Sequence, residues 1–341
     1  MKLKATLVTT AIIFFTGCSL DTTKLVPDFL KSSAGLNTSR YTVKINKRVF
    51  NVIRDGVTFT DGSYITAKGE GSINLPRGYY YVNSDGGRIL AADRVGNIIV
   101  LKDSGEEIAH TRLEAPLVSG VTYYGGIAYL LQGNRFGIYD PFKNKIIYQK
   151  EFAGGSVVDN RLANPLVTQN FLAIPTLDGK LVFISLHSYQ APSVLPVGTL
   201  KNYGNMIFLK MLNDKIVAAT PTNIITVSRA GKQTYNAKVA DLTIHNGIIY
   251  LLTRDGTVAK LNSNLQLIQS EKFAYADYAT IAAVDGKIFA FAKSGSLVVM
   301  DDNMKKHKVY SVGSARHYSF VSGGWLYIDN RKVNLSALNY E

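Results

Sequence analysis

The chain has 341 residues, 46% hydrophobic and 18% charged, which is enough to bury a large core in one big domain or two smaller ones. With 38 basic and 25 acidic residues the formal net charge is +13, but no block of five or six like charges occurs. This spread argues against a nucleic-acid-binding arm or a polybasic membrane patch. The 20 tyrosines and 15 phenylalanines favour strands over helices.

Residues 1–17 have the form of a secretory signal peptide. Lys2 and Lys4 make a short positive region, and residues 5–16 are an almost unbroken run of apolar or small side chains. The run is too short to span a bilayer stably, because a spanning helix needs about 20 apolar residues. We therefore expect residues 1–17 to direct export.

Cys18 is the only cysteine, and it ends the motif Phe-Thr-Gly-Cys. This motif resembles the lipobox of bacterial lipoproteins, with Phe15 where Leu is usual. The resemblance implies that Cys18 is acylated, with palmitate among its chains, and becomes the new N-terminus; Ser19 after it favours the outer membrane in that family. The alternative is a buried cysteine behind an ordinary signal peptide. A mature chain without Lys2 and Lys4 has a net charge of +11.

Residues 18–40 are polar and small and show little periodicity, which predicts a flexible tether between the lipidated cysteine and the rest of the chain. After residue 40 the sequence changes character and stays uniform to residue 341. We expect residues 41–341 to form one folded unit.

This unit consists of repeats. A turn followed by an apolar run recurs at intervals of about 40 residues, which is the signature of a repeat architecture. The turns begin at Gly87, Gly126, Asn170, Asp214, Gly247, Gly286 and Gly324. A weaker copy begins at Asn46.

The pattern of turns and apolar runs in each repeat predicts four short antiparallel strands. Pairs such as Asp178-Gly179, Asp255-Gly256 and Ser294-Gly295 supply the positive φ that tight hairpin turns need. Four strands in each of seven or eight repeats predict an all-β fold, a β-propeller of seven or eight four-stranded blades. A solenoid of strands or a pair of sandwiches is the alternative architecture.

The blade number depends on residues 41–56. The last repeat ends soon after Leu338, one strand short of a complete blade. If residues 41–56 supply that strand, the ring has seven blades; if they stand alone, it has eight. The sequence leaves both counts open.

The repeats resemble the PQQ-type propeller repeat. Residues 115–152 follow its pattern well, with Tyr148 where the repeat often has Trp, and residues 164–186 follow its first two thirds. A lipoprotein signal before such a propeller is similar to the BamB family, accessory lipoproteins of the outer-membrane β-barrel assembly machine. The resemblance implies a periplasmic scaffold that binds the barrel-forming subunit BamA through loops on one face.

The same resemblance implies a partner contact in the stretch Val157–Val167, where the family places an arginine in a loop between blades. Arg161 is the first candidate for this contact, with Asn160 and Asn164 beside it. The alternative is that Arg161 is an ordinary solvated loop residue. The single tryptophan, Trp325, and the basic charge depart from the family pattern.

The sequence gives no sign of catalysis, a metal or a cofactor. The adjacent acidic pairs Glu106-Glu107 and Asp301-Asp302 fall in predicted hairpin turns, where solvated carboxylates are common. The five histidines are scattered through separate repeats, and no nucleophile motif or phosphate-binding glycine loop occurs. A small quinoprotein-like enzyme is therefore the last of the alternatives.

We expect a non-enzymatic lipoprotein scaffold, anchored in the outer membrane by its lipid with the propeller in the periplasm. Its expected partners are envelope proteins, BamA first among them, and not nucleic acid. The alternatives are a scaffold of another envelope machine, such as a motor or secretion system, and a surface-exposed adhesin or ligand-binding lipoprotein.

Overall fold

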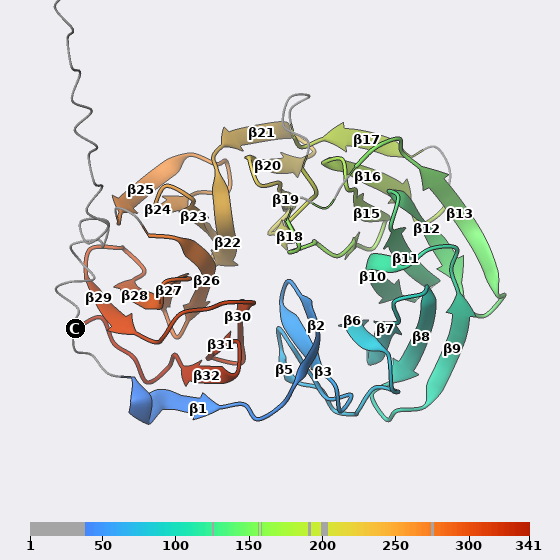
Figure 1. Cartoon of the computed structure of the whole chain (residues 1–341). Helices are drawn as coiled ribbons and strands as arrows, with labels where there is room; N and C mark the ends of the chain where they lie inside the picture. The colour runs from blue at the N-terminus through green and yellow to red at the C-terminus, as the bar shows by residue number, and fades with distance from the viewer. Residues whose placement is uncertain are drawn as a thin grey trace, which may run out of the picture.

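The chain folds into a closed ring of eight blades (Figure 1). A computed structural model describes residues 38–341 except 125, 156, 158, 190–191, 199–203 and 274–275. In these residues 32 strands form eight four-stranded antiparallel sheets. The predicted β-propeller is confirmed, and the blade number is eight.

Each blade uses four strands, and in blades 1–7 the strand that comes first along the chain lies nearest the centre of the ring, whereas in blade 8 the strand that comes first, β1 (Thr42–Lys44), is the outermost (Figure 1). Blade 1 contains β2 (Val49–Ile53), β3 (Gly56–Phe59), β4 (Tyr64–Thr66) and β5 (Gly69–Glu70). Blade 2 contains β6 (Tyr80–Asp85), β7 (Arg88–Ala92), β8 (Asn97–Lys102) and β9 (Glu107–Arg112). Blade 3 contains β10 (Leu117–Tyr123), β11 (Gly126–Leu131), β12 (Arg135–Asp140) and β13 (Lys145–Glu151). Blade 4 contains β14 (Leu166–Val167), β15 (Phe171–Pro175), β16 (Lys180–Ser185) and β17 (Ser193–Pro196).

The second half of the ring repeats this order. Blade 5 contains β18 (Phe208–Leu212), β19 (Lys215–Ala219), β20 (Asn223–Ser228) and β21 (Gly231–Asn236). Blade 6 contains β22 (Val239–His245), β23 (Ile248–Thr253), β24 (Thr257–Leu261) and β25 (Leu267–Lys272). Blade 7 contains β26 (Tyr278–Val284), β27 (Lys287–Ala292), β28 (Ser296–Asp301) and β29 (His307–Ser311). Blade 8 contains β30 (Ser319–Ser322), β31 (Trp325–Ile328), β32 (Arg331–Asn334) and β1 (Thr42–Lys44).

The apolar runs of the sequence are the second and third strands of the blades, which are covered on both faces. In β23, Ile249 and Leu251 pack towards blade 5, whereas Tyr250 and Leu252 pack towards blade 7. Successive side chains of a strand point to opposite faces, so a strand between two neighbours must be apolar throughout. This is why the repeats read as continuous apolar runs and not as alternating ones.

The core is divided into eight hydrophobic clusters, one between each pair of adjacent blades. The cluster that joins the last blade to the first contains Val57 and Phe59 from blade 1 and Phe320 and Tyr327 from blade 8. The rings of Phe320 and Tyr327 are stacked, with centroids 5.0 Å apart. The ring is therefore closed by the same kind of packing that joins its consecutive blades.

Residues 41–56 contribute to two blades, which decides the blade number. Thr42, Val43 and Lys44 of β1 pair with Val333, Lys332 and Arg331 of β32 and complete blade 8. Residues 49–53 then begin blade 1 as β2. The two alternatives considered from the sequence were wrongly treated as exclusive, and the count of seven is wrong.

The predicted signal peptide, Cys18 and the tether up to residue 37 lie outside the described residues. The described chain begins with Thr38, whose hydroxyl donates to Ser311 O at 2.8 Å, and with a 3-10 helix at Ser39–Tyr41. Within the part of the chain that the structure describes, no helix has the length and apolar character needed to cross a bilayer.

The predicted Asp-Gly and Ser-Gly turns are present between the second and third strands of three blades. Gly179, Gly256 and Gly295 have φ of 74°, 89° and 108°, a region that favours glycine. At Gly256 the backbone is also crowded, because a Cβ there would lie 2.1 Å from Phe273 O.

Replacing Gly256 by Ala tests this crowding, with Gly247→Ala as the matched control. Both glycines have positive φ, but a Cβ at Gly247 would meet no atom within 4 Å. We expect Gly256→Ala to lower the free energy of unfolding by about 2 kcal/mol more than Gly247→Ala, because overpacking adds to the shared backbone strain. Urea unfolding of both variants measures the difference, and equal losses would contradict the assignment.

Candidate functional site at the centre of the ring

The connection between β13 and β14, residues 152–165, carries the three residues predicted as partner contacts. Residues 159–163 of this connection are hydrogen-bonded to residues 205–206, which immediately precede β18 of blade 5. The amide of Asp159 donates to Asn205 Oδ1 at 3.0 Å, Asn205 Nδ2 donates to Asp159 O at 2.8 Å, and Ala163 N donates to Met206 O at 3.0 Å. These bonds direct the connection towards the centre of the ring.

Arg161 is not a solvated loop residue, because its side chain is only 24% exposed and is fully engaged. Its Nε donates to Asp159 Oδ1 at 2.9 Å, and its Nη2 forms an ion pair with the same carboxylate. Its Nη1 donates to Ala240 O in blade 6 and lies 3.9 Å from Asp241 Oδ1. Arg161 therefore links the connection to an innermost strand of another blade.

Asn164 and Asn160 are placed differently. Asn164 Oδ1 accepts from Gly120 N at 3.3 Å, and its Nδ2 lies 3.5 Å from Val82 O, so it spans the innermost strands of blades 3 and 2. Asn160 is exposed at the surface of the connection. The three predicted residues are thus close in sequence, but only Asn160 offers its side chain to solvent.

β-Bulges explain why backbone carbonyls at the centre of the ring accept these side chains. Five innermost strands skip one residue in their pairing with the second strand; the extra residues are Phe50, Val82, Val118, Ala240 and Ala279. A bulged residue is left out of the regular ladder. Three of these carbonyls contact side chains from elsewhere, namely Phe50 O with Arg94, Val82 O with Asn164 and Ala240 O with Arg161.

Asp241, the residue after the bulge in β22, is the centre of a buried ionic cluster. Arg54 Nη2 donates to Asp241 Oδ1 at 2.7 Å, and Ile281 N of blade 7 donates to Oδ2 at 3.1 Å. Arg54 lies in the β2–β3 turn of blade 1, with its side chain 11% exposed, and its Nη1 also donates to Ile207 O at 2.5 Å. We call Arg54, Asp159, Arg161 and Asp241 the axial cluster.

The sequence analysis missed Arg54 and Asp241. The available signal was the carboxylate of Asp241 within the apolar stretch Val239–Ile244, since a charged residue in a buried strand needs a partner. The partner itself could not be found from the sequence, because Arg54 lies 187 residues away.

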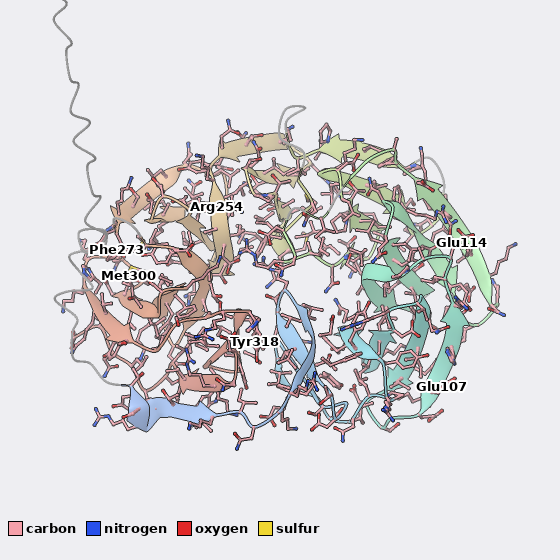
Figure 2. All side chains as sticks on the ribbon, in the orientation of Figure 1. Glu107, Glu114, Arg254, Phe273, Met300 and Tyr318 are labelled. Carbon is pink, nitrogen blue, oxygen red and sulfur yellow. The ribbon has the colours of Figure 1, made fainter. Side chains whose placement is uncertain are left out.

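Asp159 is held ionised by the cluster. Burial raises the pKa of this carboxyl, but the hydrogen bonds and charge of Arg161 and the nearby charge of Arg254 outweigh burial and keep the pKa below its ordinary value. Arg254 Nη2 lies 3.8 Å from Asp159 Oδ2, and Figure 2 shows Arg254 beside β22. Arg254 is 55% exposed, so it is the solvent-facing member of this arrangement.

Two cavities flank the β2–β3 turn. One, of about 270 Å³, is lined by Arg54, Arg161, Lys210 and Asp241 together with the innermost strands of blades 7 and 8. The other, of about 220 Å³, is lined by Arg54, Lys210 and Asn164 together with residues of blades 1 and 2. Arg54 and Asp55 border both cavities, so the turn separates them.

The acidic pairs noted in the sequence lie where strands meet hairpin turns, and not wholly in turns as predicted: Glu107 begins β9 and Asp301 ends β28. Asp301 Oδ1 accepts from the amides of Lys305 and Lys306, both at 2.8 Å, and Glu106 pairs with Lys102 at 2.7 Å. Among the residues that the structure describes, no group of three or more His, Cys, Asp or Glu side chains is arranged to hold a metal ion.

The axial cluster predicts a large loss of stability for Asp241→Ala. The change leaves Arg54 and Arg161 without the carboxylate between them, and truncating one partner of a buried ion pair costs about 3–5 kcal/mol. The control Glu106→Ala removes an exposed pair and should cost about 1 kcal/mol or less. Equilibrium unfolding in urea measures both, and similar values for the two variants would show that the cluster is not structural.

The lowered pKa of Asp159 predicts a pH-dependent difference between the wild type and Asp159→Asn. The charged carboxylate stabilises the folded chain fully above its ordinary pKa of about 4, and this contribution is lost as the pH falls towards the folded-state value. The free energy of unfolding of the wild type should therefore exceed that of Asp159→Asn by about 2 kcal/mol at pH 7, and by progressively less below pH 4. Urea unfolding at several pH values checks this, and a difference that grows on acidification would have the wrong sign.

Comparison with known proteins gives matches in sequence to PgbB from two bacterial strains and several matches in fold. No family model matches the chain. The plasminogen-binding protein PgbB of Helicobacter pylori strain J99 is 24% identical over 213 residues, which cover 60% of this chain and 39% of that protein. PgbB of strain 26695 is 23% identical over the same shares. The chain thus spans about two fifths of the length of these curated relatives.

Solved structures share the fold at low sequence identity. BamB from Moraxella catarrhalis has a TM-score of 0.66 and 13% identity, covering 85% of this chain and 97% of that one. The C-terminal WD40 domain of Sif2 has a TM-score of 0.62 and 12% identity, covering 86% and 97%. AztD from Citrobacter koseri has a TM-score of 0.57 and 15% identity, covering 79% and 87%. These likenesses show that the chain shares the β-propeller fold with these proteins.

Proposed function

We propose that the chain is a protein-binding propeller scaffold of the bacterial envelope, and not an enzyme. One observation carries the proposal: the two carboxylates of the axial cluster, Asp159 and Asp241, are each only 9% exposed and are held by arginines. An acid–base catalyst needs a carboxyl poised near the working pH, whereas the pKa of Asp159 is lowered away from it. The cluster instead fixes connections and innermost strands from several blades in one arrangement.

The finer form of the proposal is a lipoprotein attached through Cys18 to the outer membrane, with the ring in the periplasm as an accessory subunit of β-barrel assembly. The lipobox-like motif and the likeness in fold to BamB support it. In this form the exposed side of the β13–β14 connection, at Asn160, contacts the partner, which would be BamA. Arg161 and Asn164 hold the connection in place from within the ring.

A second candidate is a surface-exposed lipoprotein that binds a host protein. The specific observation in its favour is the sequence similarity to a protein named for plasminogen binding. A scaffold of a motor or secretion system remains the third form of the same proposal. In all three the propeller binds proteins, and they differ in the side of the membrane and in the partner.

The test is mild crosslinking in intact cells, followed by purification through a C-terminal tag and identification of the proteins recovered. We expect a barrel-assembly protein to be recovered, and its yield to fall about tenfold in Asn160→Arg and Arg161→Glu, since each changes the connection that makes the contact. Arg229→Glu, a charge reversal at an exposed position in the β20–β21 turn, is the matched control.

Three outcomes separate the forms of the proposal. Recovery of motor or secretion proteins keeps the scaffold and excludes the barrel-assembly role. Digestion of the ring by protease added to intact cells favours the surface-exposed form. Cys18→Ala should release the protein from the membrane fraction, and continued membrane association of this variant would contradict lipid anchoring.

A further inference from the structure

The smaller of the two cavities beside the β2–β3 turn, of about 220 Å³, lies among blades 1, 2 and 5 and the β13–β14 connection. Its walls come from the β2–β3 and β4–β5 turns, from β6 and β18, and from the connection. Figure 1 shows β2, β6 and β18 around the centre of the ring. A cavity of about 150 Å³ holds a benzene molecule, so this one has room for a small organic ligand.

The ion-paired groups near this cavity neutralise one another. The charged side chains in its wall are Arg54, Asp55, Lys68 and Lys210. The axial cluster contains two arginines and two aspartates, and two neighbours add one charge of each sign. Arg54 Nε lies 3.6 Å from Asp55 Oδ1, and Arg254 Nη2 lies 3.8 Å from the carboxylate of Asp159. The arginines and aspartates at the centre of the ring are therefore neutral in sum.

The two lysines of the wall carry the uncompensated charge. Within the part of the chain that the structure describes, no carboxylate oxygen lies within 4.0 Å of the ammonium nitrogen of Lys68 or Lys210. Neither ammonium group donates a hydrogen bond to another described residue. Because an ammonium group can only donate, each has all its donors available to a ligand.

Lys210 is held next to the β2–β3 turn by an aromatic ring. Its Nζ lies 5.4 Å from the centroid of the Phe208 ring, and the guanidinium carbon of Arg54 lies 5.2 Å from the same centroid. Lys68 approaches from the β4–β5 turn, at the same end of blade 1 as the β2–β3 turn. Two blades thus bring one free cation each to the same cavity.

A third donor comes from blade 2. Asn83 of β6 lines the cavity, and its side chain makes no hydrogen bond to another described residue. The other polar groups of β6 at this wall are engaged, since the hydroxyls of Tyr81 and Ser84 lie 2.9 Å apart and bond to each other. Two ammonium groups and one amide, from three blades, therefore converge without acceptors of their own.

The rest of the wall is largely apolar and includes Ile53, Leu162, Pro165 and Phe208. A pocket with an apolar lining and a few convergent polar groups is typical of sites for small molecules, in which the polar groups fix the orientation of the ligand. Here the polar groups that lack partners are donors, and two of them are cations. This combination suits an apolar body that carries an oxyanion.

We propose that this cavity binds a small organic anion, whose carboxylate or phosphate group contacts Lys68 and Lys210 and whose apolar part packs on Leu162 and Phe208. The proposal goes beyond the scaffold function and does not depend on it. An acidic segment of a protein would offer the same carboxylate, but its backbone would have to follow into the centre of the ring. A free molecule of this size meets no such obstacle.

The experiment titrates the full-length protein, solubilised in detergent at low salt, with benzoate and with phenyl phosphate in a calorimeter. Benzyl alcohol, a neutral molecule of similar size, is the control ligand. We expect saturable binding of at least one anion with a Kd below about 1 mM, and no saturable binding of benzyl alcohol. The anion that binds more tightly identifies the oxyanion group that the site prefers.

Variants locate the binding in the cavity. Lys68→Met and Lys210→Met should each weaken anion binding about tenfold at an unchanged unfolding midpoint. Lys232→Met removes the same charge from an exposed position on β21, the outermost strand of blade 5, and should leave the Kd unchanged. Asp55→Asn should strengthen binding about threefold, because it removes the carboxylate that lines the cavity.

Several results would overturn the proposal. These are the absence of saturable binding of both anions up to about 10 mM, equal binding of benzyl alcohol, and an unchanged Kd in both Lys68→Met and Lys210→Met. Weaker binding in Asp55→Asn would have the wrong sign. Binding of a tetra-aspartate peptide without binding of either small anion would assign the cavity to a protein segment instead. None of these results depends on which partner the crosslinking experiment recovers, so the cavity and the scaffold function can fail separately.

Discussion

Each blade has two apolar faces, and only a neighbour on each side can cover both. A row of such blades leaves one uncovered face at either end, so the fold must close into a ring. Closure here has two parts. The cluster between blades 8 and 1 buries the last two faces, and β1, from the beginning of the described chain, completes the sheet formed by its end. The stability of every other blade depends on this seam, because opening it would expose two apolar surfaces at once.

A second constraint acts at the centre of the ring, on the backbone groups of the innermost strands. These strands pair on one side only, and five of them also carry bulges that displace a residue from the ladder. Arginine and asparagine side chains contact three of the displaced carbonyls, and Asp241 receives Arg54, Arg161 and the amide of Ile281. Blades 1, 6 and 7 and the β13–β14 connection meet at this one carboxylate. The axial cluster thus ties together segments that have no strand pairing with one another.

The sequence was sufficient for the repeat, the strands and the ring, because these follow from local signals that recur. Apolar runs, Asp-Gly turns and a spacing of about 40 residues each point to the same blade. The sequence was insufficient where one segment contributes strands to two blades, and where residues distant in the sequence form contacts. Residues 41–56 were treated as belonging to one blade, although β1 and β2 belong to different ones. Arg161 was selected because of the family resemblance. Its contacts with Ala240 O and Asp241 could not be predicted from the sequence, because they form only when the blades are arranged in the closed ring.

The position of β1 gives the ring a mechanical property. Any force applied to the chain before Thr38 runs towards the closing strand, which pairs over only three residues. It first meets the bond from Thr38 to Ser311 and the side chain of Tyr41, which packs between blades 7 and 8. Traction from the N-terminal side is therefore borne first by the outer strand of blade 7, and the seam is loaded only after that attachment gives way. The attachment of Thr38 and Tyr41 therefore protects the β1–β32 pairing, which completes blade 8, from tension on the N-terminal side of the chain.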